Sequence, residues 1–329
     1  MKIFSFPHLV IHELVKQMEP VELVILSLCS KKAHAVVKAF AKIKYDLQIR
    51  RSYIQDLYGL YFRERQQSVI WAALEKELNR ETTKLKTHRG FKLRIADKRN
   101  LFTYWKDVVQ GCQEITAYVC GLFNASVSMI DISDEQSLRI LDFVSQLQEQ
   151  QLKTVVTSGS QMSAKGYSSV LRCTATEKLD VWSKPPPGYR FDGNLPAVKE
   201  ELYIKFGGWI TTKQLLSVKS RNVRLRGTNL TMMDVDELLE CYSRGELPNL
   251  RFLEFNLSRL RFYSQRTRIR RETVNEEIRY TWKRDEPVLK FQSPRSFHIL
   301  LDDKVVATIK CDGSYFTMVV WPDINGNRV

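Results

Sequence analysis

The sequence lacks the marks of the common nucleotide-dependent enzymes and of membrane proteins. It has no Gly-x-x-x-x-Gly-Lys-Ser/Thr loop and no Gly-x-Gly-x-x-Gly run, so no phosphate-cradling or dinucleotide-binding site is indicated. No stretch reaches the roughly 18 uncharged apolar residues that a membrane span needs. The first residues include Pro7, His8, His12 and Glu13, which is unlike a secretory signal. We therefore expect a cytoplasmic or nuclear protein with no membrane partner.

Clustered metal ligands and paired cysteines are also scarce. His8 and His12 are spaced to share one helix face, but no third ligand is spaced to complete a metal site with them. Cys112 and Cys120 are eight residues apart without a partner pair, which disfavours zinc. We expect reduced thiols, no metal, no other cofactor and no catalytic residue. The cysteines are Cys29, Cys112, Cys120, Cys173, Cys241 and Cys311.

What is present is a globular composition with a strong positive charge. The chain has 329 residues, of which 43% are hydrophobic and 27% are charged, so it can bury a sizeable core. This length suggests about two domains. The 51 basic residues exceed the 37 acidic ones by 14, which permits binding to acidic partners, nucleic acid included, without showing it.

The first forty residues predict three short helices separated by helix-breaking positions. Pro7 suits a first helical position because its missing N–H would be unpaired there. Pro20 ends one helix and begins the next. Apolar residues follow at helical spacing. They are Ile11, Leu14, Val15 and Met18, then Val21, Leu23, Val24, Ile25, Leu26 and Leu28, then Ala33, Val36, Val37 and Phe40.

The second of these helices is apolar nearly all round, whereas a helix packed on one core needs a single apolar stripe. Three helices in about forty residues cannot bury this surface among themselves, because small domains bury a small fraction of their surface. The surplus apolar face must meet either another protein or the rest of this chain. The pattern alone leaves both alternatives open.

Residues 4–45 resemble an F-box, with Pro7, Glu19-Pro20, Leu23-x-x-Leu26-Ser27 and a following Lys31 in the usual order; Phe6 stands where leucine is usual. The resemblance implies that the surplus face docks the Skp-family adaptor of an SCF-type ubiquitin ligase, which links to a cullin. It also implies a non-catalytic subunit that holds a target protein near another protein's activated ubiquitin. The expected adaptor-binding residues are Pro7, Ile11, Leu14, Met18, Pro20, Leu23, Leu26 and Ser27.

Further along, strand-like runs recur every 21 to 27 residues. Helix-like stretches separate most of them, and we expect Ser133 and Thr231 to cap two of these helices and Gly245 to end one. A strand plus a helix at this period predicts an irregular leucine-rich-repeat-like solenoid. A compact α/β domain with a mostly parallel sheet is the competing interpretation. The runs span residues 127–132, 153–157, 178–182, 201–206, 222–227 and 249–257.

Residues 222–257 and 297–321 resemble the F-box-associated region of nematode-type F-box proteins. In the second segment, three strands should be separated by turns at Asp302-Asp303 and Asp312-Gly313. The fold class predicted for the chain is α/β (α+β overall). The predicted domains are an F-box (1–48), a helical and strand connector (49–123), a leucine-rich-repeat-like domain (124–258), and a basic segment with C-terminal antiparallel strands (259–329).

Alternation along the predicted strands indicates a target-binding surface, because side chains at every second position share one face of a sheet and solenoids bind ligands on such faces. With Leu179 and Val181 turned inward, polar and aromatic residues should line the open face. They are Asp180, Trp182, Tyr203, Lys205, Arg224, Arg226, Glu254 and Asn256. The alternative for Arg224 and Arg226 is that they only keep the sheet soluble.

Residues 259–271 carry six arginines with Phe262 and Tyr263 between them. This mixture suits phosphate contacts and base stacking, or recognition of an acidic peptide, but we favour a solvated segment paired with nearby glutamates. Two alternatives to the ligase adaptor therefore remain. One is a basic nucleic-acid-binding protein, and the other is a non-degradative scaffold.

Overall fold

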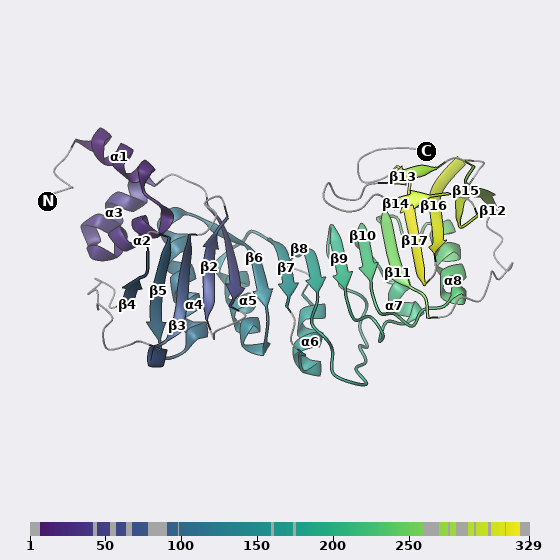
Figure 1. Cartoon of the computed structure of the whole chain (residues 1–329), viewed down its shortest axis with the longest axis horizontal. Coiled ribbons are helices and arrows are strands. Elements are labelled where there is room, and N and C mark those ends of the chain that lie inside the picture. The colour runs from purple at the N-terminus through teal and green to yellow at the C-terminus, as the bar shows by residue number, and fades with distance from the viewer. Residues whose placement is uncertain are drawn as a thin grey trace. The chain divides into compact units, whose positions relative to one another are not determined.

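The structure is a computed structural model that describes residues 7–41, 45–52, 57–63, 68–77, 91–97, 99–158, 161–173, 176–258, 270–275, 277–280, 289–292, 294–301, 304–312 and 314–322. The chain divides into two compact units, Met1–Val156 and Thr157–Val329, whose elements Figure 1 labels. The boundary between the units lies inside the 124–258 segment that the repeat pattern marks as one domain. Each unit is described by itself.

The first unit opens with α1 (His8–Gln17), α2 (Pro20–Cys29) and α3 (Lys31–Phe40). Pro20 is the first residue of α2, where a capping box joins Glu19 and Glu22. The Ser30 hydroxyl accepts the Ala33 N–H at 3.1 Å and so caps α3. The three predicted helices are confirmed, and the prolines and short polar steps set their boundaries.

A mixed sheet follows in the first unit, in the spatial order β7-β6-β1-β2-β3-β5-β4. Its strands are β1 (Asp46–Arg51), β2 (Tyr58–Phe62), β3 (Val69–Leu74), β4 (Lys92–Ile95), β5 (Asn100–Trp105), β6 (Ser126–Ile132) and β7 (Leu152–Thr157), with a short 3-10 turn, η2 (Glu75–Glu77), after β3. Helices α4 (Val108–Phe123) and α5 (Glu135–Leu147) contact each other, and α4 packs on β2, β3 and β5.

Helix α4 is fixed at both ends by local chemistry. The Asp107 carboxylate accepts the backbone N–H groups of Val109 and Gln110 at the start of the helix. Asn124 ends it with a φ of 50°, in the left-handed region that asparagine tolerates better than most residues. The apolar side of α4, including Ile115 and Val119, is buried, and this leaves another side free to meet the N-terminal helices.

The second unit is built on a parallel run of strands in chain order. β8 (Thr176–Val181), β9 (Glu201–Ile204), β10 (Asn222–Leu225) and β11 (Phe252–Asn256) pair in parallel, each with the next. Antiparallel β17 (Tyr315–Val320) then pairs with β11, and β16 (Lys304–Asp312), β15 (Ser296–Leu301) and β12 (Arg270–Thr273) follow in turn.

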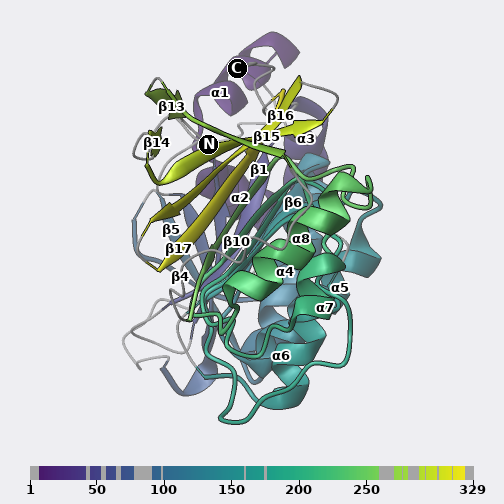
Figure 2. The same cartoon turned by 90° about the vertical axis from the view of Figure 1, so that its right-hand side faces the viewer.

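Helices cover one face of this second sheet. They are α6 (Ala164–Leu171), α7 (Thr212–Leu216) and α8 (Met232–Ser243), and Figure 2 shows α7 and α8 on one side of the strands with the hairpin β13 (Ile278–Tyr280) and β14 (Leu289–Phe291) on the other. Tyr280 and Phe291 of the hairpin pack on Phe252 and Val319 of the sheet. The hairpin thus covers one end of the face that carries no helix.

The expected fold class, with three N-terminal helices followed by irregular repeats and antiparallel strands, is confirmed. Every predicted repeat strand is present within a few residues of its expected range. Thr231 begins α8 in a capping box with Asp234, and Gly245 follows it with a φ of 77°. The expected cap at Ser133 is wrong: Asp134 caps α5 by accepting the Ser137 N–H at 2.8 Å, because a carboxylate one residue later reaches the first turn.

Within the described ranges, every helix is too short or too polar to cross a bilayer.

Candidate functional site

The first candidate surface is an apolar stripe on α1. Val10 and Leu14 are 42% and 45% exposed, and Met18, the C-cap residue directly after the helix, is half-buried. Leu9 is 73% exposed but lies about 100° further round the helix than Val10, outside this stripe. Exposed apolar residues gathered on one helix usually mark a surface that meets a partner. We call Val10, Leu14 and Met18 the α1 stripe.

The predicted adaptor-binding residues divide into two groups. Pro7 and Leu14 are exposed, and Met18 and Leu26 are half-buried, so these four have surface to offer a partner. The other four, Ile11, Pro20, Leu23 and Ser27, are buried within the chain. The chain itself therefore covers part of the surplus apolar face, and the rest of that face stays exposed or half-buried.

Ser27 and His34 attach the N-terminal helices to α4 through one tyrosine. The Ser27 hydroxyl donates to the carbonyl of Val24 at 2.6 Å and lies 2.7 Å from the Tyr118 hydroxyl. Because a serine has a single hydroxyl hydrogen, Tyr118 is the donor to Ser27. The Tyr118 oxygen then accepts from Nδ1 of His34, 3.2 Å away, which assigns the proton of His34 to Nδ1.

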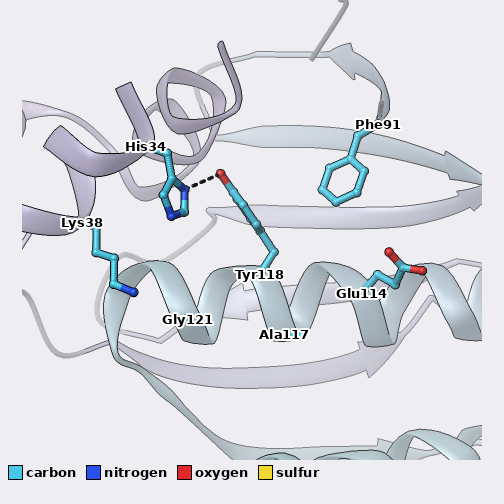
Figure 3. A pocket seen from close by; sticks show the side chains of 7 residues that line it. All are labelled: His34, Lys38, Phe91, Glu114, Ala117, Tyr118 and Gly121. Atoms are coloured by element: carbon cyan, nitrogen blue, oxygen red, sulfur yellow. Dashed lines mark hydrogen bonds between the residues drawn. The ribbon is translucent and has the colours of Figure 1, made fainter. Parts of the chain in front are cut away.

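A cavity of about 510 Å³ opens beside this network. Figure 3 shows His34 and Tyr118 joined by their hydrogen bond, with Lys38 and Glu114 nearby. The remaining lining residues are Phe91, Ala117 and Gly121. His34 and Tyr118 are already engaged with each other and with α2, so we assign this cavity no ligand of its own.

The second candidate surface is the helix-free face of the sheet in the second unit. The register aligns Asp180, Tyr203, Arg224 and Glu254 side by side across β8 to β11, and it also aligns Val181, Ile204, Leu225 and Phe255. The second set is fully buried. Asn256 ends β11 on the first face. Trp182, Lys205 and Arg226 directly follow β8, β9 and β10, and their contacts with Tyr203, Trp182 and Glu254 place them on the same face. All eight predicted residues thus share one face.

Interactions among these side chains hold that face in order. Arg226 forms an ion pair with Glu254 at 2.6 Å. Its guanidinium also lies 4.8 Å from the ring centroid of Tyr315 on β17. The ammonium of Lys205 sits 5.0 Å above the ring of Trp182, which in turn lies 4.9 Å from the ring of Tyr203. Partial burial raises the pKa of Tyr203 above its ordinary value, so the Tyr203 hydroxyl keeps its proton at neutral pH.

Sequence reasoning missed two features of these surfaces. Tyr315, 40% exposed, belongs to the sheet face because β17 pairs with β11, and its partner in the register is Asn256. Only the antiparallel pairing of the C-terminal strands reveals this. Leu9 and Val10 were not singled out, although the run from Leu9 to Ile11 is apolar on more than one side of the helix.

Other sequence features add no further site. Most of the basic segment 259–271 lies outside the described residues, apart from the backbone of β12. His8 and His12 both pack edge-on against the ring of Phe40, at 5.8 and 5.9 Å. Among the described residues no cluster of three or more potential ligands could hold a metal ion.

Two family models match the chain at the places where these surfaces lie. The F-box domain matches residues 3–44, and a family described as F-box associated matches residues 191–255. The chain is also similar to the Skn-1 dependent zygotic transcript 15 protein of Caenorhabditis elegans. The two are 22% identical over 280 residues, which cover 78% of this chain and 79% of that protein. No solved structure matches the chain.

The resemblance of this chain to F-box proteins with an F-box-associated region is thereby confirmed. The F-box match contains the α1 stripe. The F-box-associated match contains β9, β10 and most of β11, and with them five of the residues on the sheet face.

Proposed function

We propose that this chain is the target-recognition subunit of an SCF-type ubiquitin ligase. The α1 stripe, together with Pro7 and Leu26, binds a Skp-family adaptor, which links to a cullin. The sheet face of the second unit binds the target protein. Support comes from the F-box match over residues 3–44 and from the apolar exposure of Val10 and Leu14 within it.

The exposure of the stripe is the observation that carries this proposal. α1 already packs inward through Ile11 and Val15, which are 5% and 2% exposed, so its own core contact is satisfied. Val10 and Leu14 still leave 42% and 45% of their surface exposed. Burying them against a partner removes apolar surface from water at roughly 25 cal/mol per Å², which favours association.

In this role the chain contributes position rather than chemistry. Holding a target lysine beside an activated ubiquitin turns an encounter between two molecules into a reaction within one complex, and it raises the effective concentration of the lysine. Such a role needs two binding surfaces and no catalytic group. The matches to an F-box and to an F-box-associated region agree with this division of labour.

Co-expression with a Skp-family adaptor, followed by size-exclusion chromatography with light scattering, tests the proposal. We expect a one-to-one complex with the unmodified chain. Leu14→Asp should abolish it, because an unpaired charge buried in an interface costs about 2–5 kcal/mol, or roughly 30-fold to several thousand-fold in affinity.

Lys16→Asp is the matched control, because Lys16 lies on the same helix and is exposed on its opposite side. It should leave the complex intact. A complex that survives Leu14→Asp, or an unmodified chain that stays free of the adaptor, would contradict the proposed interface.

A further inference from the structure

The open end of the sheet face carries a row of five side chains that crosses five strands: Trp182, Lys205, Arg226, Asn256 and Tyr315. Asn256 pairs with Tyr315. Trp182, Lys205 and Arg226 each follow the aligned last residue of their strand, and Lys205 contacts Trp182 while Arg226 contacts Tyr315. Four inter-strand steps of about 4.8 Å make it roughly 19 Å long, the span of about six residues of extended peptide. We call it the cross-strand row.

The cross-strand row has an exposed aromatic ring at each end and positive charge between them. Trp182 is 43% exposed and Tyr315 is 40% exposed. Lys205 and Arg226 lie over these two rings, and the row contains no carboxylate of its own. Glu254 pairs with Arg226. Among the described residues, by contrast, no carboxylate lies within ion-pair distance of the exposed Lys205 ammonium. Lys205 is thus positioned by a ring and left available to an anion.

An apolar pocket begins one residue beyond the cross-strand row. Its volume is about 480 Å³, and its lining includes Phe206 and Gly227, which follow Lys205 and Arg226 in the chain. Pro185, Pro186 and Pro187 form another part of the lining, together with Trp209. Proline offers no N–H donor, so the walls suit an apolar side chain. Lys184, exposed and also in the lining, adds a second cation.

The neighbouring row on the same face distinguishes between classes of ligand. It holds the carboxylates of Asp180 and Glu254, aligned with Tyr203 and Arg224. Glu254 is buried and paired with Arg226, but a phosphate backbone, charged at every nucleotide, would meet the half-buried Asp180 carboxylate as well as the cations. An extended peptide turns successive side chains to opposite sides, so it can place acidic residues over the cross-strand row and neutral ones elsewhere.

We infer that the cross-strand row and the pocket beside it bind an extended acidic segment of the target protein, with a bulky apolar residue of that segment in the pocket. The inference rests on the proposed function and names the class of target sequence. Acidic side chains contact Lys205 and Arg226, apolar parts of the segment lie on Trp182 and Tyr315, and the apolar residue enters between Phe206 and the three prolines.

Fluorescence anisotropy on the full chain tests the inference with three labelled peptides. The first is rich in glutamate and carries one leucine. The second replaces the glutamates by lysines, and the third replaces the leucine by glycine. We expect the first to bind tightest, and its binding should weaken as salt rises. A single-stranded oligouridine serves as the nucleic-acid probe.

Three substitutions make the test specific to these residues. Lys205→Glu should weaken binding of the first peptide by about tenfold, because it replaces an attraction by a repulsion. Trp182→Ala should weaken it as well. Lys199→Glu, at an exposed lysine that precedes β9 and lies six residues before Lys205, makes the same charge change and should leave binding within twofold.

Equal binding of the acidic and basic peptides would overturn the inference. So would a Lys205→Glu variant that binds like the unmodified chain, or an oligouridine that binds more tightly than the acidic peptide. The adaptor experiment separates this result from the proposed function. A chain that binds the adaptor but no acidic peptide contradicts the inference alone, whereas a chain that binds the acidic peptide through Lys205 but no adaptor supports the inference and contradicts the receptor role.

Discussion

The hydrogen-bond chain from His34 through Tyr118 to Ser27 predicts that two substitutions far apart in sequence act on the same interaction. Tyr118→Phe removes the hydroxyl, but Ser27 keeps its bond to the Val24 carbonyl and His34 is only half-buried, so water can replace its partner. We expect a loss of about 1 kcal/mol in the stability of the contact between α2 and α4.

Ser27→Ala should cost more, because it leaves the hydroxyl hydrogen of the buried Tyr118 without its acceptor. The expected loss is about 1–3 kcal/mol. In the double variant both partners are gone, so the loss should fall short of the sum of the single losses by about 1 kcal/mol, which is the coupling typical of contacting residues.

Hydrogen exchange read on peptides from α2 and α4 is the suitable assay, because it reports local opening and needs no single unfolding transition for a chain of two units. A loss of 1 kcal/mol should speed exchange there roughly fivefold. Additive effects of the two substitutions, or faster exchange confined to other elements, would refute the hydrogen-bond chain. Adaptor affinity of the folded Ser27→Ala chain should be unchanged, since Ser27 is buried.

Three further predictions follow from other parts of the structure. In α4, Gly111→Ala should destabilise the chain by about 1–3 kcal/mol, because the new Cβ would lie 2.3 Å from ring atoms of Trp105. Gly121→Ala should instead stabilise the chain by about 0.5–1 kcal/mol, because its new Cβ meets nothing within 4 Å. Thermal melts of the two variants check these opposite signs. Leu23→Asp, at a fully buried position, should prevent folding of the N-terminal helices, seen as lost helical circular dichroism, while Leu14→Asp keeps the helical signal. Burial raises the pKa of Asp234, but hydrogen bonds from Thr212 and Thr231 outweigh burial, and the pKa is lowered from 3.8. The stability that Asp234 contributes is therefore complete above pH 3.8 and is lost as pH falls through the lowered pKa. In urea titrations, the difference in free energy of unfolding between the unmodified chain and Asp234→Asn should vanish below that pKa.

The sequence predicted local structure well because its signals are local. Pro7 and Pro20 mark helix starts by their missing N–H groups, and Thr231 with Asp234 marks the start of α8 through a capping box. Alternation along β8 to β11 predicted which side chains share a face, because successive side chains of a strand point to opposite sides, but it did not predict that Glu254 on the open face is buried.

What the sequence could not predict depends on contacts between distant residues. Ser27 reads as part of an exposed motif, and its burial follows from Tyr118, 91 residues away. Tyr315 joins the cross-strand row only through the pairing of β17 with β11. Ser133 and Asp134 both suit a helix cap, and the choice between them was settled by geometry rather than by residue type.

The reversal of strand direction at β17 limits how this protein can lengthen in evolution. The parallel strands β8 to β11 follow one another in chain order. Duplicating one strand with its helix would therefore add a strand that still pairs in parallel with both neighbours. Beyond β11, however, the adjacent place is taken by an antiparallel strand from the end of the chain. New repeats can therefore enter only upstream of β11, and an insertion between β8 and β11 would widen the open face and move Trp182 away from Tyr315. Gene copies that gain or lose a repeat would then differ in the length of the segment they recognise, even if every remaining side chain stayed the same.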